Sequence, residues 1–165
     1  MDDGQATAFQ ATDDALRMAD TVPPSDVPPY RNLFFLDGPG GTGKTFLQNI
    51  LLAHVSKQGK VALTVTSTGI AATLLDGGRT AHSRFKIPLK IRCDSTCDIS
   101  KRSDLAELIC NTKLILWDEA YMVRREVFEA VDRTFSDTRE NASVPFGAVV
   151  ICFCGDFRQT RQSTS

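Results

Sequence analysis

The sequence predicts an α/β fold, with a mostly parallel central sheet covered by helices in three layers. Three observations lead to this prediction. Short, continuous apolar runs recur along the chain, as in strands that are buried on both faces of a parallel sheet. Stretches with helical spacing of apolar residues lie between these runs. A glycine-rich segment, LDGPGGTGKT at 36–45, joins the first apolar run to the helix that follows it.

The N-terminal part predicts a helix and a linker. Apolar residues recur at helical spacing over residues 5–18. The prolines of TVPPSDVPPY, at 21–30, then exclude regular structure. We therefore expect residues 1–31 to form a helix and a proline-rich linker, and residues 32–165 to form the main domain.

Strands and helices alternate in the main domain. Strands are expected at 32–38, 60–66, 113–117 and 148–153, where the runs are apolar and rich in β-branched or aromatic residues. Helices are expected at 45–56, 69–75, 104–109 and from about residue 124 onward. Residues 76–80 predict a turn and 84–103 a long loop, and a loop of that length in a compact domain is more often functional than idle.

Length and composition suit a single domain. The chain has 165 residues, of which 42% are hydrophobic and 24% charged, close to the average for soluble globular proteins. No apolar run approaches the roughly 20 residues needed to span a bilayer, so we expect no membrane partner. The acidic N-terminus lacks the features of a targeting peptide.

The cysteines number five, and this odd count indicates a reducing compartment rather than a disulfide framework. The spacing of Cys93 and Cys97 could start a zinc site, but no second pair and no nearby histidine completes four ligands. Buried or loop thiols are the better interpretation.

The glycine-rich segment matches the phosphate-binding loop pattern, with Gly38, Gly43, Lys44 and Thr45 at the required spacing between a strand and a helix. Glycine tolerates backbone angles that turn successive N–H groups towards a phosphate, and the helix N-terminus adds further donors. Lys44 would reach the β- and γ-phosphates of ATP, and the Thr45 hydroxyl would bind Mg²⁺. The predicted nucleotide-binding residues are Gly38, Pro39, Gly40, Gly41, Thr42, Gly43, Lys44 and Thr45. The sequence thus predicts a P-loop NTPase domain.

Two acids end the third expected strand, in LILWDEA. Asp118 and Glu119 lie at the edge where an open α/β sheet binds its ligands. Asp118 can hold Mg²⁺, and Glu119 can orient and deprotonate a water for attack on the γ-phosphate. The fourth strand ends in CGDFRQ, which brings Gln159 to the same edge. The alternatives are that the two acids cap the next helix and that Gln159 belongs to a polar loop.

Charge is unevenly distributed, although the net charge is only −1. Residues 1–30 contain six aspartates and one arginine, whereas residues 79–102 contain seven Lys or Arg residues and two aspartates. A local basic stretch can bind nucleic-acid phosphates even in a nearly neutral chain. From charge alone, a solvated loop with scattered bases is the simpler interpretation.

The motifs occur in the order seen in one known family. The segments FFLDGPGGTGKTF, TSTGIAATLLDGGRTAHSRFKIPL, DSTC, SDLAELI, LILWDEA and GDFRQ resemble the Pif-one (petite integration frequency) family of ATP-dependent DNA helicases, close to its Helitron-like branch. The resemblance runs from about Leu33 to Gln159. It implies the first of two RecA-like domains of an enzyme that uses ATP and Mg²⁺ to move five-prime to three-prime on single-stranded DNA. It also implies roles in DNA repair, DNA recombination and telomere maintenance.

The resemblance also implies site residues. Lys44, Glu119 and Gln159 are the implied catalytic residues, with Gln159 sensing the nucleotide state, and Gln5 is implied to contact adenine. Two segments resemble those that contact DNA, which gives the expected contacts Thr66, Ser67, Thr68, Gly69, Arg79, Thr80, His82 and Ser83. With the resemblance, the basic stretch is better interpreted as a DNA-facing loop.

The chain departs from the family pattern at three places. Tyr121 follows DEA where the family often has proline or serine, and Cys154 replaces a glycine of the third motif. No motif of a second RecA-like domain, whose arginines would stabilise the transferred phosphoryl group, occurs in these 165 residues. The fold is therefore expected to be incomplete at its C-terminus. The alternative function is a truncated or degenerate nucleotide-binding domain with little or no helicase activity by itself.

A nucleotide kinase ranks last, because REVFEAVDRTF predicts a covering helix rather than an arginine-rich lid. The family works in nuclei and in mitochondria, and because no leader is visible we expect the nucleus. Nothing in the sequence indicates an oligomeric state.

Overall fold

The computed structural model describes residues 1–23, 26, 28, 30–73 and 77–158. Its strands are β1 (Leu33–Asp37), β2 (Val61–Thr66), β3 (Arg79–Thr80), β4 (Thr112–Asp118) and β5 (Val150–Gly155). Its helices are α1 (Asp3–Thr21), α2 (Lys44–Lys57), α3 (Gly69–Ala72), α4 (Ala81–Phe85), α5 (Asp104–Asn111) and α6 (Arg125–Thr138), with 3₁₀ turns at η2 (Ala120–Met122) and η3 (Pro145–Ala148). Over these residues, no helix combines the length and the hydropathy needed to cross a membrane.

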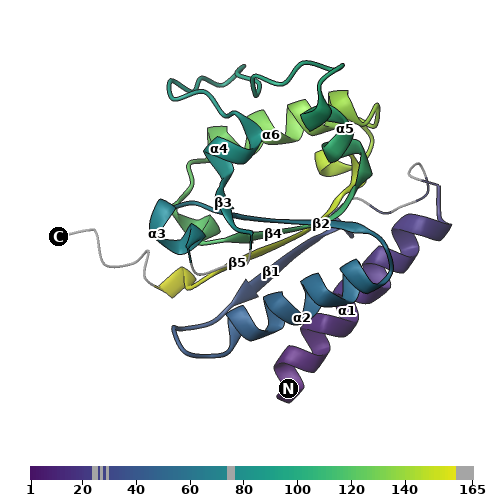
Figure 1. Ribbon diagram of the computed structural model, residues 1–165, viewed down its shortest axis with the longest axis vertical. Coiled ribbons are helices and arrows are strands. Elements are labelled where there is room, and N and C mark those ends of the chain that lie inside the picture. The colour runs from purple at the N-terminus through teal and green to yellow at the C-terminus, as the bar shows by residue number, and fades with distance from the viewer. Residues whose placement is uncertain (24–25, 27, 29, 74–76, 159–165) are drawn as a thin grey trace.

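The strands form one five-stranded sheet in the order β1-β5-β4-β2-β3, and every pairing in it is parallel. Helices α1 and α2 cover one face, while α4, α5 and α6 lie over the other (Figure 1). The predicted α/β class, with three layers around a mostly parallel sheet, is confirmed. Because parallel strands end at the same edge, the glycine-rich loop after β1 lies along the edge where Thr66 pairs with Asp118.

The face under α6 holds an aromatic core. Trp117 of β4 is fully buried and packs against Phe85 and Phe128, with ring centroids 6.0 and 5.0 Å away. Phe135 of α6 meets Phe85 edge-on at 5.1 Å. Large buried rings supply much of the hydrophobic stabilisation of a core. This core therefore anchors β4, and with it the two acids that end the strand.

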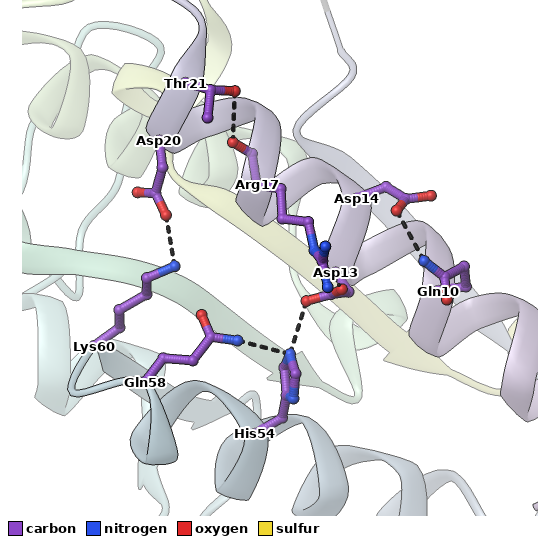
Figure 2. Close-up of polar contacts among 9 residues, drawn as sticks. All are labelled: Gln10, Asp13, Asp14, Arg17, Asp20, Thr21, His54, Gln58 and Lys60. Atoms are coloured by element: carbon purple, nitrogen blue, oxygen red, sulfur yellow. Dashed lines mark hydrogen bonds and ion pairs between the residues drawn. The ribbon is translucent and has the colours of Figure 1, made fainter.

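Helix α1 is fastened to the opposite face by apolar and polar contacts. Leu16 is buried in the same cluster as Leu51 of α2. Asp13 is hydrogen-bonded to His54 of α2 at 2.7 Å and accepts a bond from Arg17 at 2.8 Å (Figure 2). Burial alone would raise the pKa of Asp13, but His54 and Arg17 outweigh it and hold the pKa below its ordinary value. Helix α1 thus shares a core with the domain that begins after the linker.

The first helix begins earlier than expected, at Asp3. Asp2 caps it, since its carboxylate accepts a bond from Gln5 N at 2.8 Å while the Gln5 side chain accepts one from Asp2 N at 3.1 Å. At the far edge of the sheet, β3 and α4 replace part of the expected turn and loop. Thr80 caps α4 by accepting a bond from Ser83 N at 3.2 Å. The short length of both elements hides them in the hydrophobic pattern.

Candidate nucleotide site and DNA-facing edge

The glycine-rich loop has glycine where two different constraints require it. Gly41 and Gly43 have left-handed backbones, with φ of 81° and 77°, which other residues resist. A Cβ at Gly43 would collide with Gln5 Nε2, and one at Gly38 would lie 2.8 Å from Thr42 Oγ1. The backbone angle therefore selects glycine at position 41, and the lack of space for a Cβ selects it at position 38.

Lys44 is the first residue of α2 and folds over the loop. Its ammonium donates to the Pro39 carbonyl at 2.9 Å and also to the Gly38 carbonyl. The Gly38 N–H in turn donates to Gly155 O at 3.2 Å, which ties the loop to the end of β5. A helix N-terminus with a lysine and free N–H groups favours anions. These donors fit the phosphates of ATP.

Helix α1 places Gln5 against the same loop. Its Nε2 donates to Thr42 O at 3.2 Å. A cavity of about 300 Å³ opens here, and its lining includes Gln5, Gly38 and Lys44. Gln5 thus lies beside the loop, and its contact with adenine stays a prediction.

Asp118 is the last residue of β4 and Glu119 follows it, at the same edge. Burial raises the pKa of Asp118, while the Glu119 N–H, which donates to Asp118 Oδ1 at 3.0 Å, and the charge of Lys44 oppose the rise. Because β1, β5 and β4 are parallel neighbours, the loop that follows β1 and the acid at the end of β4 lie at the same edge of the sheet. The Asp118 carboxylate and the exposed Thr45 hydroxyl are oxygen ligands of the kind that Mg²⁺ prefers.

Glu119 carries a side-chain contact that sequence reasoning missed. Its backbone is left-handed, with φ of 52°, which is uncommon for a residue other than glycine. Its carboxylate accepts a hydrogen bond of 2.6 Å from Thr68 Oγ1. The sequence did predict that the strands before Thr68 and Glu119 are parallel. It does not show that these strands, β2 and β4, are neighbours in the sheet, so the contact could not be predicted.

The predicted DNA contacts at 66–69, at the end of β2, are partly buried. Thr66 is fully buried, which removes it from any surface that a strand of DNA reaches, and its hydroxyl accepts a bond from Thr68 N at 3.4 Å. Ser67 N donates to Asp118 O at 3.2 Å. Gly69, in contrast, is exposed. This segment therefore contacts Asp118 at one end and is exposed to solvent at the other.

The predicted contacts around β3 and α4 lie at the edge of the sheet and include the exposed residues Arg79 and Ser83, with Thr80 and His82 partly buried. Burial lowers the pKa of the neighbouring Arg84, and the charge of Arg79 lowers it further. Neither arginine forms an ion pair within the part of the chain that the structure describes. We call Arg79, Arg84 and helix α4 the basic corner.

Gln159, the predicted sensor, lies outside the described residues. The residues just before it contact the end of β1, next to the phosphate loop, since Phe157 N donates to Asp37 Oδ1 at 3.1 Å. Tyr121, a departure from the family pattern, packs on the end of β5, where a Cβ at Gly155 would lie 2.6 Å from its ring. Burial, and then the charges of Glu119 and other nearby acids, raise the pKa of Tyr121.

The cysteine pair of the disfavoured zinc interpretation is split between surface and core. Cys93 is exposed and Cys97 is buried. Burial raises the pKa of the Cys97 thiol to about 11, with Thr134 and Arg133 acting against it, so this thiol is protonated at neutral pH. Within the described ranges, no three His, Cys, Asp or Glu side chains are grouped so as to hold a metal ion.

Comparison with known proteins decides the family. The family described as PIF1-like helicase matches residues 14–162. The chain belongs to the PIF1-like helicase family. It is 33% identical over 129 residues to the ATP-dependent DNA helicase PIF1 of Trypanosoma brucei brucei, a match that covers 78% of this chain and 13% of the relative. The resemblance inferred from the motifs is confirmed.

Solved Pif1 structures share the fold. Pif1 from Bacteroides sp in complex with ADP-AlF4 superposes with a TM-score of 0.75 at 26% identity, over 99% of this chain and 34% of that chain. Bacteroides Pif1 bound to ssDNA gives a TM-score of 0.66 at 30% identity, over 89% of this chain and 32% of that chain. The chain thus spans about a third of the length of these helicases.

Proposed function

We propose that this chain is the ATP-binding domain of an ATP-dependent DNA helicase, in which ATP hydrolysis is coupled to single-stranded DNA. One observation carries the proposal. The phosphate loop after β1 and the two acids at the end of β4 meet at one edge of the parallel sheet, and the Gly38 N–H ties the loop to Gly155 at the end of β5, the strand between them. Family membership supports the same function, because the matching relatives are named ATP-dependent DNA helicases. The solved Bacteroides proteins bind ADP-AlF4 and ssDNA.

Each residue has a defined role in this proposal. The loop N–H groups and Lys44 bind the β- and γ-phosphates. Thr45 and Asp118 would hold Mg²⁺, which supplies charge stabilisation to the transferred phosphoryl group. Glu119 takes a proton from the attacking water. The basic corner binds DNA phosphates.

Several finer statements rest on the family resemblance alone and stay predictions. They are the sensor role of Gln159, movement from five-prime to three-prime, and the roles in repair, recombination and telomere maintenance. The nuclear location is a prediction of the same kind.

A second candidate is a nucleotide-binding domain that hydrolyses little ATP by itself. The chain matches 13% of the trypanosome protein and 34% of the Bacteroides one. An arginine supplied from outside the P-loop domain raises the rate by about 10³- to 10⁵-fold where it has been measured.

The two candidates are separated by measuring binding and hydrolysis together. Labelled ATP and a dT oligonucleotide are titrated into the chain, with and without the second RecA-like domain of a Pif1 relative added as a separate protein. We expect both ligands to bind the chain alone, and hydrolysis to rise when DNA and the second domain are both present. Glu119→Gln is the control that binds without hydrolysing.

Failure to bind either ligand would contradict the helicase proposal. Binding of both ligands without hydrolysis under any condition would instead favour the second candidate.

A further inference from the structure

A single hydrogen bond joins the segment expected to face DNA with the acid expected to activate water. Thr68 Oγ1 donates to Glu119 Oε2 at 2.6 Å. The acceptor is a carboxylate, so this bond is shorter and stronger than one between neutral groups. Both residues are partly buried, and a lowered local dielectric strengthens the bond further.

The main chain on both sides of this bond is held in register by the sheet. Thr66 pairs with Asp118 across β2 and β4, and Ser67 N donates to Asp118 O at 3.2 Å. The Glu119 N–H is engaged by Asp118 Oδ1. A displacement of the chain at Thr68 therefore changes the distance between the hydroxyl and the carboxylate, because the acid is fixed from its own side.

Thr68 is also where α3 begins, and α3 is open to the outside. The Thr68 side-chain oxygen accepts a bond from Ala71 N at 3.4 Å and so caps the helix. The next two residues, Gly69 and Ile70, are exposed, and 82% of Ile70 is accessible. A ligand that binds this surface acts on the residue that holds Glu119.

We propose that the Thr68 hydroxyl restrains the Glu119 carboxylate, and that single-stranded DNA bound at Thr68–Ala72 releases it. A carboxylate oxygen that accepts a bond from Thr68 is held in place and has one lone pair fewer for a water proton. DNA releases the acid if it binds better to the state in which Thr68 has moved. Thr68 is then a positioning residue that makes hydrolysis depend on DNA. This inference rests on the proposed function and adds a means of regulation to it.

Three variants test the restraint by ATP hydrolysis. Thr68→Val removes the donor and keeps the side-chain shape, while Thr68→Ser keeps the donor. Thr73→Val is the matched control, because Thr73 follows α3 and its hydroxyl donates to Ile70 O at 2.7 Å, with no contact to Glu119. Single-turnover hydrolysis is measured without and with a dT oligonucleotide, in the presence of the added second domain.

In Thr68→Val we expect the DNA-free rate to rise about 10-fold, the scale of one hydrogen bond to a charged group, and the stimulation by DNA to fall by the same factor. Thr73→Val is expected to match the wild type in both, and Thr68→Ser, which keeps the donor, is expected to keep the wild-type ratio of the two rates. A purely structural role of Thr68 would lower the two rates together and leave their ratio unchanged.

Oligonucleotide affinity is a second measurement that does not require hydrolysis. If DNA binding breaks the bond, a chain that lacks the bond binds DNA more tightly, so Thr68→Val should lower the oligonucleotide Kd about 10-fold. In a Glu119→Ala background the bond is already lost, and Thr68→Val should then change nothing.

Unchanged rates and affinity in Thr68→Val would overturn the inference. So would a lowered DNA-free rate, which would mean that the hydroxyl orients the acid for catalysis rather than restraining it. If the wild-type chain bound no oligonucleotide at all, the proposed function itself would fail and this inference with it.

Discussion

The phosphate loop and the basic corner serve the same sheet edge but are built in different ways. In the loop, the predicted residues bond to one another, as Lys44 does to Pro39 and Gln5 to Thr42. In the basic corner, Arg79 is exposed and forms no ion pair with a described residue. The loop is organised by its own main chain, whereas the corner keeps its charge available for a partner. A preorganised site and a site that depends on a partner can therefore be told apart by whether their side chains are already bonded within the protein.

Replacement of Lys44 tests the preorganised phosphate loop and has the largest expected effect. Lys44→Ala should weaken Mg²⁺-ATP binding about 10- to 150-fold, because a charged hydrogen bond contributes about 1.5–3 kcal/mol. Isothermal titration calorimetry measures it. Lys57→Ala, at the other end of α2, is the matched control. Equal affinities for Lys44→Ala and the wild type would remove Lys44 from phosphate binding.

Helix α1 contacts the loop through Gln5, and replacing Asp13 tests how α1 is attached to α2. Asp13→Asn should lower the free energy of unfolding by about 2 kcal/mol at pH 7, because its two hydrogen bonds involve a charge. Its pKa is lowered in the folded state. The stabilisation is therefore present above the unfolded pKa of 3.8 and is lost as the pH falls through the folded pKa.

Urea unfolding from pH 7 down to pH 2 measures this difference. Asp14→Asn is the matched control, since Asp14 is exposed and bonds only to Gln10 of its own helix among the described contacts. A gap between Asp13→Asn and the wild type that stays constant down to pH 2 would show that the charge of Asp13 does not matter.

Two glycines of the loop differ in backbone angle, so replacing each by alanine tests whether the left-handed backbone is what requires glycine. Gly41→Ala should lower the free energy of unfolding by about 1–2 kcal/mol, the cost of a left-handed alanine, because its φ is 81° and no atom lies within 4 Å of its Cβ position. Gly40→Ala should change stability little, because no atom lies within 4 Å of its Cβ position. Thermal unfolding compares the two. Equal losses would mean that the loop is not held in the conformation described.

Charge reversal in the basic corner has the smallest expected effect. Arg79→Glu should weaken single-stranded oligonucleotide binding about 3- to 5-fold and reduce the salt dependence of log K by about one phosphate contact. Arg31→Glu makes the same change just before β1, at the opposite end of the sheet. Fluorescence anisotropy at several salt concentrations measures both. If the two variants lost the same affinity, the corner would have no special role.

The sequence predicted what depends on local backbone and missed what depends on distant pairing. The loop from Gly38 to Thr45 was predicted at one edge because a strand, a loop and a helix in succession define its geometry. Asp118 and Glu119 were predicted there because the strands of a parallel sheet end at the same edge. The contact between Thr68 and Glu119 was not predictable, since it requires β2 to pair with β4. The short elements β3 and α4 were missed because two to five residues do not produce a hydrophobic period.

Glu119 occupies a backbone conformation that glycine or asparagine adopts at lower cost. An engineer who ranked substitutions by melting temperature alone would replace this residue early and would obtain a more stable fold without the carboxylate that we propose to activate water. Position 119 is a place where stability and chemistry favour different amino acids. Lys86 and Glu140 have left-handed backbones too, so the angle reveals the conformational cost, and the place of Glu119 beside Asp118 distinguishes it from them.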